Sequence, residues 1–146
     1  MFKLRQATRE DIPQCLAKAK SFITLYEDDK LFDMKTIVFL FLTLIDNGIF
    51  LVCEKDGNIC GGFGAVIVPH YFNASLLIGS EVFWWVDEDV RTGKPALLLF
   101  NGFLKEAETK KLNLVSISKL YNSNLKDEFL EKRGFVIKEK GFYKWL

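Results

Sequence analysis

Histidine and cysteine, the side chains most often used to bind transition metals, are scarce in this sequence. It has one histidine, His70, and three cysteines, Cys15, Cys53 and Cys60. One histidine cannot hold a metal ion alone, and no cysteine pair has the C-x-x-C spacing of a zinc or redox motif. An odd number of cysteines in apolar surroundings favours buried free thiols over disulfides. We therefore expect no metal site, and we expect His70 to be an exposed loop residue.

Long apolar runs are also missing. The longest, residues 37–45, is about half of what a helix needs to cross a bilayer. Charges near the N-terminus interrupt the segment that would be apolar in a signal peptide, so we expect a cytoplasmic protein with no membrane partner. The G-x-S-x-G and phosphate-loop G-K-S/T motifs are absent. Without linkers or repeats, the 146 residues are expected to form one domain, residues 1–146.

The sequence also lacks a strong excess of positive or negative charge. The net charge is +1, divided into −5 over residues 1–90 and +6 over residues 91–146. This excess is too small for a surface that binds duplex DNA, so nucleic acid is not an expected partner. The polarity fits a small anionic ligand on the C-terminal half, although charges that only face solvent would give the same division.

Apolar residues are abundant, at 49% with fourteen phenylalanines, which predicts a thick core or an apolar groove. Period-two and helical patterns follow one another in the order β-α-α-β-β-β-α-β-α-β, with one or two strands at the end. This order predicts an α/β fold, a mixed parallel and antiparallel sheet with helices on both faces. The expected strands are residues 2–7, 49–54, 59–68, 76–86, 114–118 and 135–146, and the expected helices are residues 11–25, 33–47, 95–111 and 122–132.

Glycines mark turns and close contacts in this order. Asp56-Gly57 is typical of a tight hairpin turn. Three glycines, Gly61, Gly62 and Gly64, lie inside the strand that returns from it. They indicate a bulge or a close backbone approach, because a glycine has no side chain to pack.

The stretch from Glu81 to Lys111 combines an aromatic strand, an acidic turn, a short loop and a helix. Unpaired N–H groups and the dipole make a helix start a site for phosphate or pyrophosphate. Pro95 falls at an early helical position, where its missing N–H costs least.

Two motifs in this order resemble the GNAT superfamily of acetyl-CoA-dependent N-acyltransferases, especially its short single-domain bacterial or phage-type members. The first is Val86-Asp-Glu-Asp-Val-Arg-Thr-Gly-Lys-Pro-Ala96, which resembles the coenzyme loop Arg/Gln-x-x-Gly-x-Gly/Ala. The second is the Gly134-Phe135 pair after the last helix. Two positions differ from the family pattern: Lys94 stands where a loop glycine is usual, and Leu130 stands where many members have a tyrosine that protonates the departing thiolate.

The resemblance implies acetyl-CoA as cosubstrate, no metal, and direct attack of an amine on the thioester. The amine acceptor is expected to be a small molecule or a peptide. The backbone of Trp85 and Val86 would pair with the pantetheine arm. The residues implied in coenzyme binding are Trp85, Val86, Arg91, Thr92, Gly93, Lys94, Pro95, Ala96, Asn122 and Asn124. For Asn122, a role as the N-cap of the following helix is the alternative.

An amine must lose a proton before it attacks, so the reaction needs a base or a desolvating site. Glu81, a lone carboxylate in an apolar strand, is the candidate base, and Tyr121 is a candidate substitute acid. Alternation places Glu81 on the same face as Phe83 and Trp85, although a bulge could reverse this, and a solvent-facing Glu81 with no role remains the alternative. The acidic residues Glu27, Asp28, Asp29 and Asp33, with Phe39 and Phe41, are candidates for the acceptor side.

Two other functions remain open. The altered loop and Leu130 also suit a module of the same fold that binds acyl-CoA or a protein without turnover. A related chemistry, such as aminoacyl or nucleobase modification, has only the basic C-terminal half in its favour. The tail Phe142–Trp145 has a strand pattern and could pair across two chains, as in a homodimer.

Overall fold

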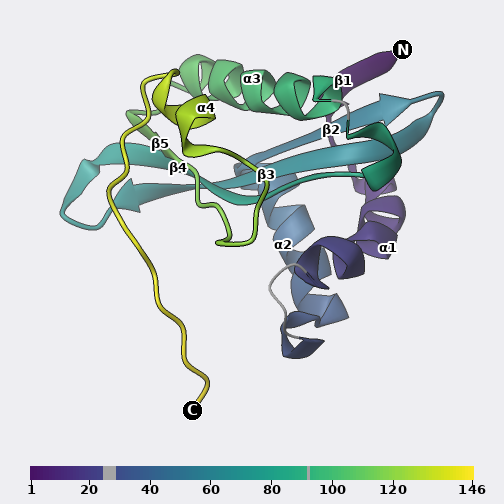
Figure 1. Ribbon diagram of the computed structural model, residues 1–146, viewed down its shortest axis with the longest axis horizontal. Helices are drawn as coiled ribbons and strands as arrows, with labels where there is room; N and C mark the ends of the chain where they lie inside the picture. Colours follow the sequence, from purple (N-terminus) through teal and green to yellow (C-terminus); the bar gives the residue numbers. More distant parts are fainter. Residues whose placement is uncertain (25–28, 92) are drawn as a thin grey trace.

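A five-stranded sheet divides the molecule, with α3 on one face and α1 and α2 on the other (Figure 1). This computed structural model describes residues 1–24, 29–91 and 93–146. The strand order is β1-β2-β3-β4-β5, antiparallel except for the parallel pair β4–β5. The strands are β1 (Phe2–Gln6), β2 (Ile49–Lys55), β3 (Asn58–His70), β4 (Asn73–Val86) and β5 (Leu114–Ser116). The helices are α1 (Ile12–Ile23), α2 (Met34–Asn47), α3 (Lys94–Thr109) and α4 (Asp127–Glu131), with short turns η1 (Arg9–Asp11), η3 (Asp29–Leu31) and η4 (Glu88–Val90).

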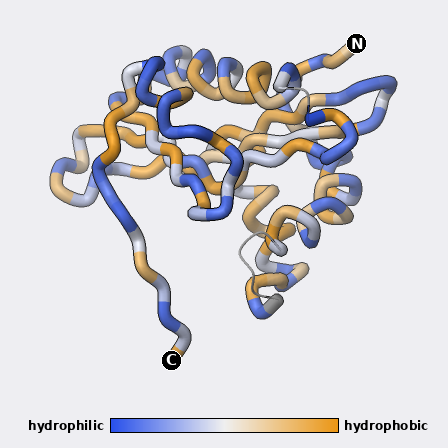
Figure 2. The backbone as a smooth tube through the Cα atoms, viewed as in Figure 1, coloured by the Kyte–Doolittle hydropathy of each residue, from blue (hydrophilic) through white to orange (hydrophobic). Residues whose placement is uncertain are grey.

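The expected mixed sheet with helices on both faces is confirmed, and the phenylalanines fill a core on each face. Towards α1 and α2, the ring centroids of Phe41 and Phe50 lie 5.2 Å apart, and both rings contact Phe83. Towards α3, Phe63 stacks on Phe103 at 4.5 Å. Figure 2 shows the apolar stretches of the helices turned towards the sheet. Each face of the sheet is therefore stabilised by its own aromatic cluster.

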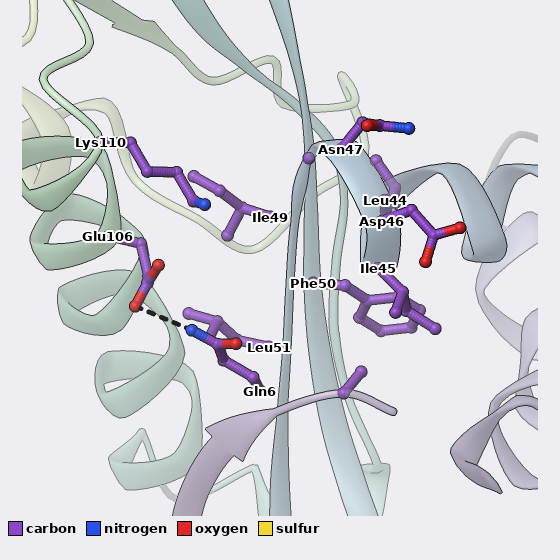
Figure 3. A pocket seen from close by; sticks show the side chains of 12 residues that line it. Gln6, Leu44, Ile45, Asp46, Asn47, Ile49, Phe50, Leu51, Glu106 and Lys110 are labelled. Carbon is purple, nitrogen blue, oxygen red and sulfur yellow. Dashed lines mark hydrogen bonds between the residues drawn. The ribbon is translucent and has the colours of Figure 1, made fainter. Parts of the chain in front are cut away.

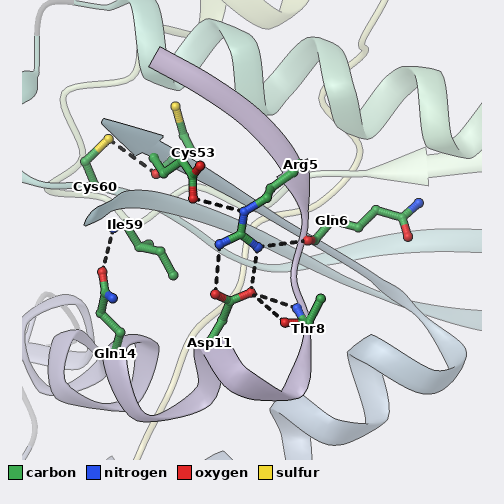
Figure 4. A network of polar contacts seen from close by, with 9 residues as sticks. Arg5, Gln6, Thr8, Asp11, Gln14, Cys53, Ile59 and Cys60 are labelled. Carbon is green, nitrogen blue, oxygen red and sulfur yellow. Dashed lines mark hydrogen bonds and ion pairs between the residues drawn. The ribbon is translucent and has the colours of Figure 1, made fainter. Parts of the chain in front are cut away.

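An ionic network joins β1 to β2 and to the start of α1 (Figure 4). The Arg5 guanidinium donates to both carboxylate oxygens of Asp11, at 2.7 and 2.9 Å, and to Glu54 at 3.0 Å. Asp11 also accepts the Thr8 N–H at 2.8 Å. The hydrogen bonds from Arg5 hold the pKa of Asp11 below its usual value, because they favour the charged carboxylate.

The hairpin between β3 and β4 is longer than the sequence predicts. Residues 69–75 were expected to be a loop, but only Tyr71 and Phe72 lie between the two strands. His70 ends β3 and is half-buried, and its Nδ1 accepts the Phe72 N–H at 3.0 Å. The prediction of an exposed loop histidine is therefore wrong. β3 continues through Pro69 to His70.

The C-terminal region differs most from the expectation. Residues 122–132 were predicted as one helix, yet α4 covers only Asp127–Glu131 and begins after Lys126 rather than after Asn122. Gly134 has a φ of 87°, and the Phe135 N–H donates to the Leu130 carbonyl, so the expected chain reversal is present. Residues 135–146 form no strand. The final strand or strands of the predicted order are therefore not found.

Candidate functional site

β4 and β5 separate halfway along β4, and this separation creates the candidate site. The parallel pairing joins Ile78 to Leu114 and ends at Ser80 and Ser116, whose hydroxyls lie 3.0 Å apart. Within the part of the chain that the structure describes, β4 continues from Glu81 to Val86 with β3 as its only strand partner. On the side away from β3, a strip of β4 backbone therefore has no strand partner among the described residues.

A β-bulge in β4 decides which way Glu81 points. The register pairs Gly64 with Phe83 and Ala65 with Glu81, which leaves Val82 as the extra residue. Phe83 and Val82 both pack in the core of α1 and α2, while Ala65 belongs to the core of α3. Glu81 therefore lies on the α3 face. The predicted alternation, with Glu81 beside Phe83 and Trp85, is wrong because the bulge shifts the alternation by one residue.

The glycines of β3 make this arrangement possible. A Cβ on Gly64 would lie 2.4 Å from the Phe83 ring, and a Cβ on Gly62 would lie 2.8 Å from the Trp85 indole nitrogen. Side chains at these positions would push the aromatic residues of β4 away from the sheet. The predicted bulge is confirmed, and the groups that approach Gly62 and Gly64 most closely are aromatic side chains rather than backbone.

The Glu81 carboxylate sits where the two strands part. Its Oε1 accepts the Ser118 N–H at 3.2 Å, just beyond the end of β5. Burial raises the pKa of Glu81 to about 7, and this hydrogen bond opposes part of that rise. A carboxyl group with this pKa exchanges a proton near neutral pH, as a general base must.

The other end of the free β4 strip leads to the N-terminus of α3. Gly93 caps the helix in the left-handed region with a φ of 93°, and a Cβ there would meet no atom within 4 Å. The Leu97 N–H bonds the Gly93 carbonyl, and Pro95 has no N–H to offer. The backbone N–H groups of Lys94 and Ala96 are therefore the first-turn donors that remain for an anion. No acidic residue lies in this first turn.

The backbone N–H and C=O groups of β4 face β3 and the open side at alternate residues. The Asp87 N–H donates to the Cys60 carbonyl at 2.8 Å. Alternate residues of a strand bond the same neighbour, so Trp85 and Phe83 bond β3, and the polar groups of Trp84 and Val86 turn to the open side. The Val86 carbonyl there accepts the Arg91 Nε at 3.0 Å.

No family model matches this sequence, and no curated protein does either. Solved structures do match over nearly the whole chain. A "predicted acetyltransferase" from Clostridium acetobutylicum, solved with acetyl-CoA, aligns with a TM-score of 0.79 at 16% identity, covering 99% of this chain and 96% of that one. The chain has the GNAT acetyltransferase fold. At this identity the likeness shows the fold alone.

Two further structures with this fold differ in what they acetylate. An aminoglycoside acetyltransferase from an uncultured soil metagenomic sample, solved with sisomicin, aligns with a TM-score of 0.71 at 13% identity, over 99% of this chain and 95% of that one. A ribosomal-protein-alanine N-acetyltransferase from Brucella melitensis aligns with a TM-score of 0.74 at 16% identity, over 99% and 98%. The same GNAT fold therefore serves both small-molecule and protein acceptors.

The tryptophans of β4 lie on opposite faces of the GNAT sheet. Trp85 is buried, and its ring stacks on Phe22 of α1 at 5.8 Å. Trp84 packs between Phe100 of α3 and Phe129 of α4, and its buried Nε1 has no hydrogen-bond partner among the described residues. Packing explains both rings, so any contact of this strand with a cosubstrate would come through its backbone.

Tyr121, Asn122 and Asn124 lie in the exposed segment that leads from β5 to α4. Their assignment to catalysis or coenzyme binding stays a prediction, as do those of Arg91, Gly93, Lys94, Pro95 and Ala96. Thr92 lies outside the described residues.

The expected acceptor wall on α2 is only partly present. Asp33 caps α2 by accepting the Thr36 N–H at 3.1 Å, and Phe41 is buried in the core. Phe39 is exposed on the outer side of the helix. Glu27 and Asp28 lie outside the described residues, as does the side chain of Asp29.

A separate hollow of about 220 Å³ lies where β1 ends (Figure 3). Its walls come from the end of α2, the start of β2 and the C-terminal turns of α3, including Glu106, which accepts a hydrogen bond from Gln6 at 3.3 Å. The candidate anion site is at the opposite end of α3. The hollow is therefore not part of the site described above.

The described residues contain no cluster of three or more side chains able to hold a metal ion. All three cysteines are buried free thiols, as expected. Burial raises the pKa of Cys15 and of Cys53 to about 12, so neither thiol has the low pKa of a nucleophile. No described helix is long and apolar enough to cross a membrane. A cytoplasmic location stays a prediction.

Proposed function

We propose that this protein is an acetyl-CoA-dependent N-acetyltransferase. The observation that carries the proposal is the position of Glu81 at the point where β4 and β5 separate, with the N-terminus of α3 at the other end of the same open strip. A thioester bound along this strip would place its acyl end near Glu81 and its phosphates at α3. The Clostridium structure of the same fold, solved with acetyl-CoA, supports this choice of cosubstrate.

The residues around the α3 N-terminus suit a pyrophosphate. The Lys94 and Ala96 N–H groups and the positive end of a 16-residue helix face the loop. Lys94 is exposed and can add its own charge. Pro95 reduces the number of backbone N–H donors. The charged Lys94 side chain would contact the phosphates in place of some of the N–H groups that a glycine-rich loop offers.

Glu81 would act as the general base, directly or through a water molecule. An alkylamine is almost fully protonated at pH 7, and a carboxylate with a pKa of about 7 can accept its proton as the new C–N bond forms. The acetyl group leaves sulfur for nitrogen, and coenzyme A departs as a thiolate. A thiol pKa near 8.5 makes this thiolate a tolerable leaving group, so the half-buried Leu130 does not prevent the reaction.

The acceptor is an amine, either of a small molecule or of a peptide. Enzymes of the same fold act on aminoglycosides and on a ribosomal protein. A second candidate, a module that binds acyl-CoA without turnover, is favoured by Pro95 in the loop and by Leu130 at the position of the usual acid. Both candidates require the same acetyl-CoA site.

Thermal unfolding with acetyl-CoA, desulfo-CoA and free CoA tests the shared site. A ligand at a hundred times its dissociation constant adds about 2.7 kcal/mol, which raises the melting temperature by roughly 5–10 °C for a chain of this size. No shift with any of the three would overturn both candidates. Thiol release with a panel of primary amines then separates them, because only the enzyme releases CoA in an amine-dependent way.

A further inference from the structure

Lys18 of α1 forms an ion pair that the roles assigned so far do not explain. Its ammonium group pairs with the carboxylate of Asp87, the residue that directly follows β4. The two side chains are only 29% and 27% exposed. The Lys18 Nζ also lies 5.8 Å from the centroid of the Trp85 ring, in a cation–π contact. A carboxylate and an aromatic ring at the end of β4 therefore hold this ammonium group in one place.

The same face of α1 also contacts the start of β3. Gln14 lies one helical turn before Lys18, and its Oε1 accepts the Ile59 N–H at 2.5 Å (Figure 4). The Asp87 N–H donates to the Cys60 carbonyl at 2.8 Å, which joins the end of β4 to the start of β3. α1 therefore contacts these two strand ends through a neutral hydrogen bond at Gln14 and through a charge at Lys18.

Asp87 begins the acidic turn that leads to the candidate anion site. Asp87, Glu88 and Asp89 place three carboxylates directly before the loop at the start of α3. The chain folds back through η4, so that the Arg91 Nε donates to the Val86 carbonyl at 3.0 Å. Arg91, a basic residue of this loop, therefore lies against the residue that precedes Asp87.

An unpaired carboxylate at this position would oppose the binding of an anion. Asp87 alone would repel phosphate at the N-terminus of α3, and it would attract the neighbouring Arg91 away from that phosphate. Glu88 and Asp89 are exposed, so water and salt screen their charges. Asp87 is more enclosed, and its charge is neutralised by Lys18 instead.

We propose that Lys18 is a positioning residue for the coenzyme, which sets the affinity for the phosphates of acetyl-CoA by neutralising Asp87. It acts from α1, on the face of the sheet opposite α3, and through Asp87 rather than by contact with the coenzyme. The inference rests on the proposed function, because it concerns the same acetyl-CoA site. It requires that the pair be neutral, so two uncharged residues should serve as well as the ion pair.

Titration calorimetry of acetyl-CoA into the wild type, Lys18→Met, Asp87→Asn and the double variant Lys18→Met/Asp87→Asn tests this role. Lys18→Met should bind about three- to tenfold more weakly, because it leaves a negative charge unpaired near the phosphates. Asp87→Asn should bind at least as tightly as the wild type, and the double variant should bind like the wild type. A purely structural ion pair predicts instead that both single variants weaken binding, since either one breaks the pair.

Gln14→Leu is the matched control, because it removes the other polar contact on the same face of α1 without changing a charge. It should lower the melting temperature and leave the affinity for acetyl-CoA unchanged. The difference between Lys18→Met and the wild type should also shrink in about 0.5 M salt, where charges are screened within a few ångströms.

The outcomes separate this inference from the proposed function. A wild type that does not bind acetyl-CoA would overturn the proposed function and the role of Lys18 together. If the wild type binds, the role of Lys18 alone is overturned when Lys18→Met binds equally well, when Asp87→Asn weakens binding to the same extent, or when the double variant stays as weak as Lys18→Met.

Discussion

The stability of the Glu81→Gln variant relative to the wild type should be greater at alkaline pH than at acidic pH. The Glu81 pKa rises from 4.5 to about 7 on folding, so between these values the folded state binds a proton that the unfolded state has lost. The contribution of Glu81 to the wild-type free energy of unfolding is fully present below pH 4.5 and is lost as the pH rises through 7. Glutamine cannot ionise. The advantage of Glu81→Gln should therefore grow by about 2.5 kcal/mol between pH 5 and pH 8.

Urea unfolding at pH 5, 6, 7 and 8, followed by tryptophan fluorescence, measures this difference. Glu108→Gln on the exposed side of α3 removes one negative charge without touching the site and is the matched control. A constant difference between Glu81→Gln and wild type across this pH range would refute the raised pKa of Glu81 in the folded protein. In the enzyme, the same variant should lose about 10²-fold or more of its turnover at neutral pH and less at high pH, where free amine is abundant.

Three further variants test the loop, the core and the ionic network. Gly93→Ala should cost about 1 kcal/mol of stability and weaken acetyl-CoA binding, because the residue must hold a φ of 93°; calorimetry checks both. Phe103→Ala should cost about 3–5 kcal/mol in urea unfolding, since Phe103 is fully buried. Asp11→Ala should cost about 1–3 kcal/mol at pH 7. That deficit should shrink on acidification, because the lowered pKa of Asp11 makes its contribution disappear as the pH falls through the folded value.

The order of elements follows from local patterns and could be predicted. Helical periodicity located α1, α2 and α3 within a few residues, and the Asp56-Gly57 turn located the first hairpin, where both residues have positive φ. These signals depend on residues close in sequence. The family resemblance was also visible locally, because the coenzyme loop is one continuous stretch.

The orientation of Glu81 could not be predicted, because it depends on a pairing between distant residues. The bulge at Val82 lies beside the place where the Phe83 ring covers Gly64 of the neighbouring strand. A count along β4 alone places Glu81 on the wrong face. The glycines of β3 carried the only sequence signal of this irregularity.

The two wrong predictions near the C-terminus have different physical causes. Asn122, Ser123 and Asn124 favour turns over helix, since their side chains compete for backbone hydrogen bonds, and α4 begins only after them. The tail has the composition of a strand, but a strand forms only beside a partner. The residue pattern of the tail therefore predicts that it can pair as a strand. In the isolated chain it has no strand partner among the described residues.

Titration calorimetry of acetyl-CoA into the wild type, Lys94→Glu and Lys105→Glu tests the central claim most directly. Both variants change the charge of α3 equally. An acidic residue in the first turn suits the helix dipole, so Lys94→Glu should stay folded while it repels the phosphates. We predict that the wild type and Lys105→Glu bind alike and that Lys94→Glu binds at least about tenfold more weakly, or 1.4 kcal/mol. No binding by the wild type, or equal binding by all three, would contradict an acetyl-CoA site at this helix.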